Sequence, residues 1–263
     1  MSGYMAVFSA RFRTLLQYRA AALAGFGTQL FWGLIRIMIF EAFFASSARS
    51  QPMRLDETIT YIWLGQALFA LLPFRTDPDV SQMIRTGSVA YELVRPVDLY
   101  GFWFARAVAD RVAPTLLRAV PMMIVAALFL GLRPPADWQC GAAWAIATMG
   151  AVLISSAITA LMTISLLWTT AGDGIARLMP TIVLFFSGML VPLVFLPASF
   201  QPLVNALPFR DIIDVPFRVY MGHLPPSQWP ALLAQEIVWI AVLVTLGRWL
   251  LGRSMSRLVV QGG

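Results

Sequence analysis

Long apolar runs dominate this chain and set the first limit on its fold. A helix that crosses about 30 Å of hydrocarbon needs roughly 20 apolar residues, and six stretches meet this requirement, near residues 22–44, 57–74, 105–131, 139–168, 175–196 and 231–251. Only 12% of the 263 residues are charged, about half the fraction usual in a soluble domain. The sequence therefore predicts an all-α, polytopic integral membrane protein, with a single domain over residues 1–263 and six transmembrane helices.

Prolines interrupt the fifth of these runs. They stand at positions 192, 197, 202 and 208, and each removes a backbone donor and breaks a helix. Irregular backbone survives at membrane depth only where protein or water shields it. We therefore expect a span over 175–190 and a broken, re-entrant hairpin over 191–208, within an extracytoplasmic segment that runs to residue 226.

All 19 basic residues are arginine, and their distribution predicts the orientation of the chain. If both ends face the cytoplasm, thirteen arginines lie on that side, five lie on the other, and Arg36 lies within a span. Arginine accumulates on the cytoplasmic side of membrane proteins, so we expect an N-in/C-in topology. Because these arginines are scattered along loops, the net charge of +6 does not predict a nucleic-acid partner.

The first 21 residues have the pattern of an amphipathic helix. Phe8 and Phe12 recur at helical spacing on one side, and Arg11 and Arg13 supply a polar side. Such a helix lies along the membrane interface rather than across it. We therefore expect an interfacial helix over residues 1–21, in contact with lipid.

A charged stretch, MIRTGSVAYELVRPVDLYG (residues 83–101), lies in the main cytoplasmic loop over residues 75–104. Gly87 is suited to end a short helix, and Pro96 prevents a following helix from continuing. We expect a short helix–turn–helix whose apolar contacts come from Met83, Ile84, Tyr91 and Leu93, while Arg85, Glu92 and Arg95 face water or a partner protein. An ordinary solvated loop is the alternative interpretation.

Several kinds of chemistry are excluded by composition. The chain has one cysteine, Cys140, and one histidine, His223, so we expect neither an internal disulfide nor a Cys- or His-based metal site. The sequence contains no lysine, so it lacks the residue that a P-loop uses to contact nucleotide phosphates. Asp173 lies in a Gly–Asp motif, but no second aspartate faces it from a suitable span for protease chemistry. We expect no enzymatic activity and no cofactor in this chain.

Polar residues within the spans are the remaining candidates for a translocation path. Gln29, Arg36 and Gln66 are the ones we select, although a structural role for Arg36 is also open. Ser155 and Thr159 are expected to bond across helices. Arg106 and Asp110 are four residues apart, which makes a local ion pair plausible.

The order of these features resembles that of the ABC-type-2 transporter permeases. Their first-loop motif, Ile–(Arg/Lys)–x–Gly followed by Leu–x–(Arg/Lys)–Pro, is matched here by Ile84, Arg85, Gly87, Leu93, Arg95 and Pro96. The Pro-rich stretch before the last span, FFSGMLVPLVFLPASFQPLVNALPFR, is also similar to the family, and the resemblance covers nearly the whole chain.

This resemblance implies a six-span permease of a bacterial ABC exporter in the inner membrane. Such a subunit works with a second permease chain, identical or related, and with two cytoplasmic ATPase chains that bind ATP and Mg²⁺. The coupling surface would comprise the N-terminal helix and residues 83–96, with Met83, Ile84 and Leu93 seated in a groove of the ATPase and Arg85, Glu92 and Arg95 fixing the register.

A secondary transporter or channel driven by an ion gradient is the alternative function. Such proteins commonly have internal repeats or titratable groups buried in their spans. The sequence shows no convincing repeat, and its acids lie near span ends, as Glu41 and Glu236 do. No feature of the sequence selects a substrate among drugs, lipids, glycans and peptides.

Overall fold

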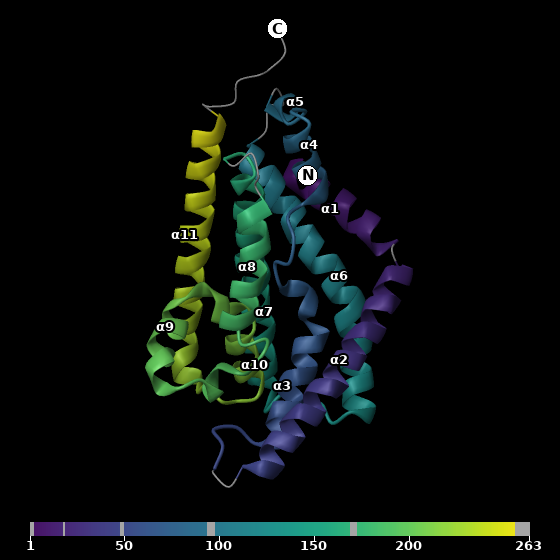
Figure 1. The fold of residues 1–263 in the computed structure, drawn as a ribbon, viewed down its shortest axis with the longest axis vertical. Helices are drawn as coiled ribbons and strands as arrows, with labels where there is room; N and C mark the ends of the chain where they lie inside the picture. Colours follow the sequence, from purple (N-terminus) through teal and green to yellow (C-terminus); the bar gives the residue numbers. More distant parts are fainter. Residues whose placement is uncertain (1–2, 18, 48–49, 94–97, 169–172, 256–263) are drawn as a thin grey trace.

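The fold is a bundle of long helices (Figure 1), seen in a computed structural model that describes residues 3–17, 19–47, 50–93, 98–168 and 173–255. Within these ranges every regular element is helical. The elements are α1 (Gly3–Leu16), α2 (Arg19–Ser46), α3 (Leu55–Ala67), η1 (Phe69–Leu71), α4 (Pro78–Arg85), α5 (Ala90–Leu93), α6 (Leu99–Phe129), α7 (Trp138–Ser165), α8 (Asp173–Phe186), η2 (Leu193–Phe195), η3 (Ala198–Phe200), α9 (Gln201–Ala206), η4 (Pro208–Ile212), α10 (Asp214–Tyr220), η5 (Pro226–Gln228) and α11 (Trp229–Met255).

Four helices in the described part of the chain are long and apolar enough to cross a membrane, namely Leu23–Ser46, Leu99–Phe129, Trp138–Ser165 and Pro226–Met255. Four of the six predicted spans coincide with them. The other two differ from the prediction. The stretch 57–74 contains α3, which has only 13 residues, and 175–196 contains α8, which ends at Phe186.

These two helices are shorter than the apolar runs that contain them, and local sequence explains why. At 1.5 Å per residue, α3 is about 20 Å long, less than the hydrocarbon thickness. It is followed by a 3₁₀ turn and Pro73, and α8 is followed by Gly188, which has a φ of +88°. Apolar composition extends past each helix end, so hydropathy alone overestimated both lengths.

Helix α3 forms the centre of the bundle rather than a lipid-facing span. Its residues from Thr60 to Ala67 are all buried, and Tyr61, Trp63 and Leu64 belong to the main apolar core. Phe217 of α10 packs edge-on against Tyr61, with ring centroids 5.0 Å apart. This central position explains how a short helix is stabilised by packing on all sides.

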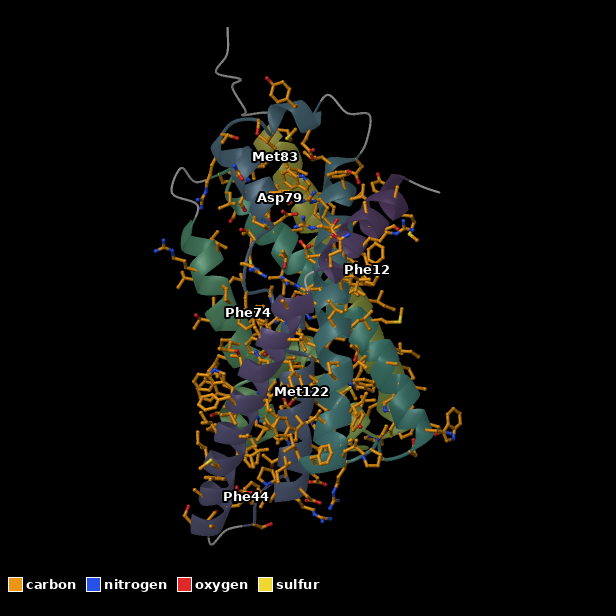
Figure 2. The ribbon with its side chains drawn as sticks, turned by 90° about the vertical axis from the view of Figure 1, so that its right-hand side faces the viewer. Phe12, Phe44, Phe74, Asp79, Met83 and Met122 are labelled. Carbon is orange, nitrogen blue, oxygen red and sulfur yellow. The ribbon has the colours of Figure 1, made fainter. Side chains whose placement is uncertain are left out.

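The two ends of the bundle differ in what they carry (Figure 1). The N-terminus, α4, α5 and the last turn of α11 lie at one end, and the connections α2–α3, α6–α7 and α10–α11 lie at the other. Figure 2 shows Asp79 and Met83 near the first end, with Phe12 below them, and Phe44 at the opposite end. We call these the α4 end and the hairpin end.

The segment from 191 to 226 contains only short helices and 3₁₀ turns. Prolines begin or precede several of these turns, including Pro192, Pro197 and Pro208. The segment nevertheless contributes to the core, because Ile212, Ile213 and Phe217 are fully buried. The hairpin is therefore broken in backbone but packed into the protein.

Close packing between α2 and α3 depends on Gly33. A Cβ atom at this position would overlap the ring of Trp63 and would lie 3.1 Å from Cγ of Gln66. Trp63 has little freedom to move, because its Nε1 donates a hydrogen bond to the carbonyl of Leu130 over 2.8 Å. Small residues let transmembrane helices approach closely in this way.

Replacing Gly33 with alanine should therefore destabilise the bundle by about 1–3 kcal/mol, the usual cost of overpacking. The matched control is Gly27→Ala on the same helix, where an added Cβ meets nothing within 4 Å. Alanine's helix propensity should leave that variant unchanged or up to about 1 kcal/mol more stable. The measurement is the free energy of unfolding by SDS titration of the purified chain, and equal stability of the two variants would contradict the packing argument.

Candidate functional site

The short helix α4 lies in the predicted coupling loop, and residues that favour a helix start and a helix end stand at its two ends. Asp77 precedes it, and its side chain accepts hydrogen bonds from the backbone N–H groups of Asp79 and Val80, over 2.9 and 3.2 Å. Pro78 occupies the first helical position, where its missing donor costs nothing. Gly87, with a φ of +74°, follows the C-cap residue. The helix therefore begins after a side-chain N-cap and ends before a glycine with a positive φ. Gly87 ends it as predicted.

Apolar residues of α4 pack inward onto the protein. Val80 is fully buried in a cluster with Tyr100 and Trp103 of α6, and Met83 and Ile84 pack partly against the same cluster. The sequence predicted that Met83 and Ile84 would be contacts for a partner. Part of their surface is instead used inside this chain, because α6 and α11 lie directly beside α4.

The charged and aromatic residues of α4 and α5 also differ in part from the expectation. Arg85 is exposed, as predicted. Glu92 is only 8% exposed, so it does not face water as predicted, and Tyr91, expected to make apolar contacts, is 79% exposed. Arg95, Pro96 and the side chain of Leu93 lie outside the described part of the structure.

Five charged residues form an ion-pair cluster where α1, α4 and α6 meet. Arg106 of α6 donates to both oxygens of Asp77, over 2.7 and 3.1 Å, and to Asp79 over 2.6 Å. Arg11 of α1 donates to Asp79 and to Asp110 of α6, each over 2.8 Å. We call Arg11, Asp77, Asp79, Arg106 and Asp110 the α1–α4–α6 cluster.

This cluster replaces the local pair that the spacing suggested. Arg106 and Asp110 do not form an ion pair within 4 Å; each bonds to a residue of another helix. Asp77 has two roles, since it both caps α4 and binds Arg106. Nothing in the spacing of Asp77 and Arg106, which are 29 positions apart, marks them as partners, so the sequence analysis missed them.

The surroundings of Asp79 favour its charged form. Partial burial opposes ionisation of Asp79, but the hydrogen bond from Arg106 and the charges of Arg11 and Arg106 outweigh this and lower the pKa of Asp79. A group with a lowered pKa stabilises the fold above its unfolded pKa and loses that contribution as the pH falls through the folded value. Asp79 is therefore charged and paired at neutral pH.

The predicted interfacial helix is joined to the bundle by this cluster. Phe8 and Phe12 stack on each other, with centroids 5.6 Å apart, and none of the residues of α1 is fully buried. Arg11 faces the cluster, whereas Arg13 is exposed. The helix therefore lies on the surface of α6 and is held there by Arg11.

The three predicted translocation-path residues come together between α2 and α3. When the Gln66 amide is oriented to suit its neighbours, its nitrogen donates to the backbone carbonyl of Gln29 over 3.2 Å and to the Gln29 side chain, and its oxygen accepts from Arg36 over 3.3 Å. Arg36 also donates to the carbonyl of Leu190 over 2.8 Å. These contacts support the structural role for Arg36, because its guanidinium donates a hydrogen bond to the carbonyl of Leu190, which lies after the end of α8.

A buried arginine lies between α6 and α7. Arg111 is 7% exposed and donates to the hydroxyls of Ser155 and Thr159, over 3.1 and 2.5 Å. Ser155 in turn donates to the carbonyl of Leu71 after α3. The expectation that Ser155 and Thr159 bond across helices is confirmed, and their partner is a charged residue.

Loss of the Arg11 contacts should release α1 from the bundle. Arg11→Gln removes bonds to two carboxylates, and charge-assisted bonds of this kind are worth about 1.5–3 kcal/mol each. We expect amide hydrogen exchange in residues 3–16 to accelerate by about tenfold or more. Arg13→Gln is the matched control, with the same charge change on an exposed side chain of the same helix, and equal acceleration in both variants would refute the assignment.

Comparison with known proteins identifies a family. No curated protein matches the chain. A family model described as "ABC-2 family transporter protein" matches residues 30–262, a range that includes α4, the hairpin segment, part of α2 and the other three long helices. Because the match covers most of the sequence, this chain belongs to the ABC-2 family of transporters, as the membrane-embedded component of an ABC transporter.

Proposed function

We propose that this chain is the permease of an ATP-driven exporter in the bacterial inner membrane. It works with a second permease chain and with separate ATPase subunits that bind ATP and Mg²⁺. The α4 end faces the cytoplasm, in line with the arginine distribution. The chain has no lysine with which to build a P-loop of its own.

One observation carries the coupling part of this proposal, namely the α1–α4–α6 cluster. Arg106 is a bidentate partner of Asp77, which caps α4, and it also binds Asp79 in the first turn. Paired, charge-assisted bonds fix geometry as well as distance. A force applied to α4 is therefore passed to α6, which runs from the α4 end to the hairpin end of the bundle.

The same cluster makes α1 part of the moving unit. Arg11 binds Asp79 of α4 and Asp110 of α6, so α1 cannot keep its position if α4 and α6 separate. Side chains of α4 and α5 with exposed surface, including Arg85 and Tyr91, stand at the outer edge of this unit. We assign them to the surface that contacts the ATPase, together with the partly buried Met83 and Ile84.

Tyr91 is the residue through which this assignment is best tested. An aromatic side chain that is 79% exposed has the properties of an interface anchor. Trp138, at the hairpin end, is also 79% exposed and provides a matched control. The proposal places the two on opposite sides of the membrane.

The experiment is a detergent pull-down of the tagged chain from its native membrane, with mass spectrometry of the proteins that co-purify. We expect wild type and Trp138→Ala to recover a protein that carries a P-loop, and Tyr91→Ala to recover about tenfold less, the loss typical of an interface hot spot. Recovery of the second permease chain, or an increased stoichiometry of this one, tests the pairing.

Two results would contradict the proposal. Equal recovery of the ATPase by both alanine variants would remove Tyr91 from the contact surface. Purification of the chain without any P-loop protein, under conditions that preserve other membrane complexes, would favour a transporter driven by an ion gradient.

A further inference from the structure

A groove at the hairpin end combines apolar walls with two acidic residues. It lies between the first halves of α7 and α11, beside η4 and α10, and has a volume of about 320 Å³. Tryptophan, alanine and branched aliphatic side chains make most of its lining, and its only ionisable residues are Asp211 and Glu236. The net charge of the chain is +6, yet the lining of this groove contains two carboxyl groups and no basic residue.

Glu236 is the residue that most needs an explanation. It is 6% exposed, and within the described part of the chain it makes no hydrogen bond or ion pair. Its carboxylate lies against Gly150 of α7, where any Cβ atom would overlap it. A buried carboxyl group without a partner is costly to ionise, and the absence of a side chain at Gly150 leaves the space that the Glu236 carboxyl group occupies.

Asp211 adds a second acidic group, which is only partly compensated. It is 1% exposed, and Arg210 lies 3.5 Å from its Oδ1 atom. Its Oδ2 atom has no hydrogen-bond partner among the described residues. Arg210 is therefore the ion-pair partner of Asp211 alone, and among the described residues no basic side chain pairs with Glu236.

The lining restricts what could supply the missing positive charge. A metal ion would need more ligands, and the described residues contain no group of three His, Cys, Asp or Glu side chains that could hold one. The apolar walls suit a carbon-rich body, and the faces of Trp138 and Trp229 attract cations. The volume is at the lower end of that of small-molecule sites.

We propose that this groove binds a small organic cation with an apolar body, with the Glu236 carboxylate as its counter-charge. The binding does not depend on ATP coupling. Only the identification of such a cation as the exported substrate rests on the function proposed above.

The test uses two ions of nearly the same size and shape but opposite charge. Tetraphenylphosphonium and tetraphenylborate are added to the purified chain in phosphatidylcholine nanodiscs, with empty nanodiscs as the blank for partition into lipid. We expect saturable binding of the cation only. Glu236→Gln should weaken that binding by about tenfold or more, since it removes the charge from a buried pair.

Two further variants serve as controls. One removes an acidic charge outside the groove, and the other changes the shape of the groove without a change of charge. Glu41→Gln makes the same change at an exposed acid on α2, outside the groove, and should leave binding unchanged. Ala143→Phe fills the groove without a change of charge, and should abolish binding. Each variant is first checked for wild-type elution and unfolding behaviour.

The proposal is overturned if tetraphenylborate binds as well as the cation, or if Glu236→Gln binds like wild type. Binding that survives Ala143→Phe would place the cation elsewhere and would also overturn it. None of these results affects recovery of the ATPase in the pull-down, so failure of this site and failure of the proposed function are distinguishable.

Discussion

The structure depends on one constraint, which is that backbone groups cannot be left unpaired in hydrocarbon. Each such group costs several kcal/mol, and in the described part of the chain helices end or break after α3, α6 and α8. Side chains from other helices pair the open groups. Arg36 binds the carbonyl of Leu190, Ser155 that of Leu71, Trp63 that of Leu130, and Asp214 the N–H of Leu193.

These contacts explain why the short helices α3 and α8 are compatible with a membrane protein. Each is too short to cross the membrane by itself, and each is followed by buried residues, Leu71 and Leu72 after α3 and Ser187 and Met189 after α8. The polar side chains within the spans that make these contacts therefore stabilise the fold. Arg36, a predicted residue of the translocation path, connects α2 to the segment after α8. Gln66, also predicted for that path, connects α3 to α2.

The two ends of the molecule differ in whether their buried and partly buried charged residues are paired. At the α4 end, two arginines and three aspartates form ion pairs and join three helices into one unit. At the hairpin end, Glu236 has no partner among the described residues and lies beside an apolar groove. A paired cluster is suited to transmit force, and an unpaired carboxyl group is suited to bind a ligand.

The sequence alone determined the class of fold, the four long spans, the break after α8 and the end of α4 at Gly87, because these depend on features that are local. Apolar length, prolines, an N-cap and a glycine act over a few residues. Family membership followed from the order of the same local motifs.

Only the tertiary structure decided which charges meet. The i,i+4 rule paired Arg106 with Asp110, but once α4 folds back onto α6, Asp77 is closer and binds both nitrogens of a bidentate guanidinium. Partial burial of Met83, burial of Glu92, exposure of Tyr91 and the absence of a partner for Glu236 among the described residues likewise depend on neighbours distant in the chain. Pairing and burial are properties of helices packed together, and no local pattern of residues encodes them.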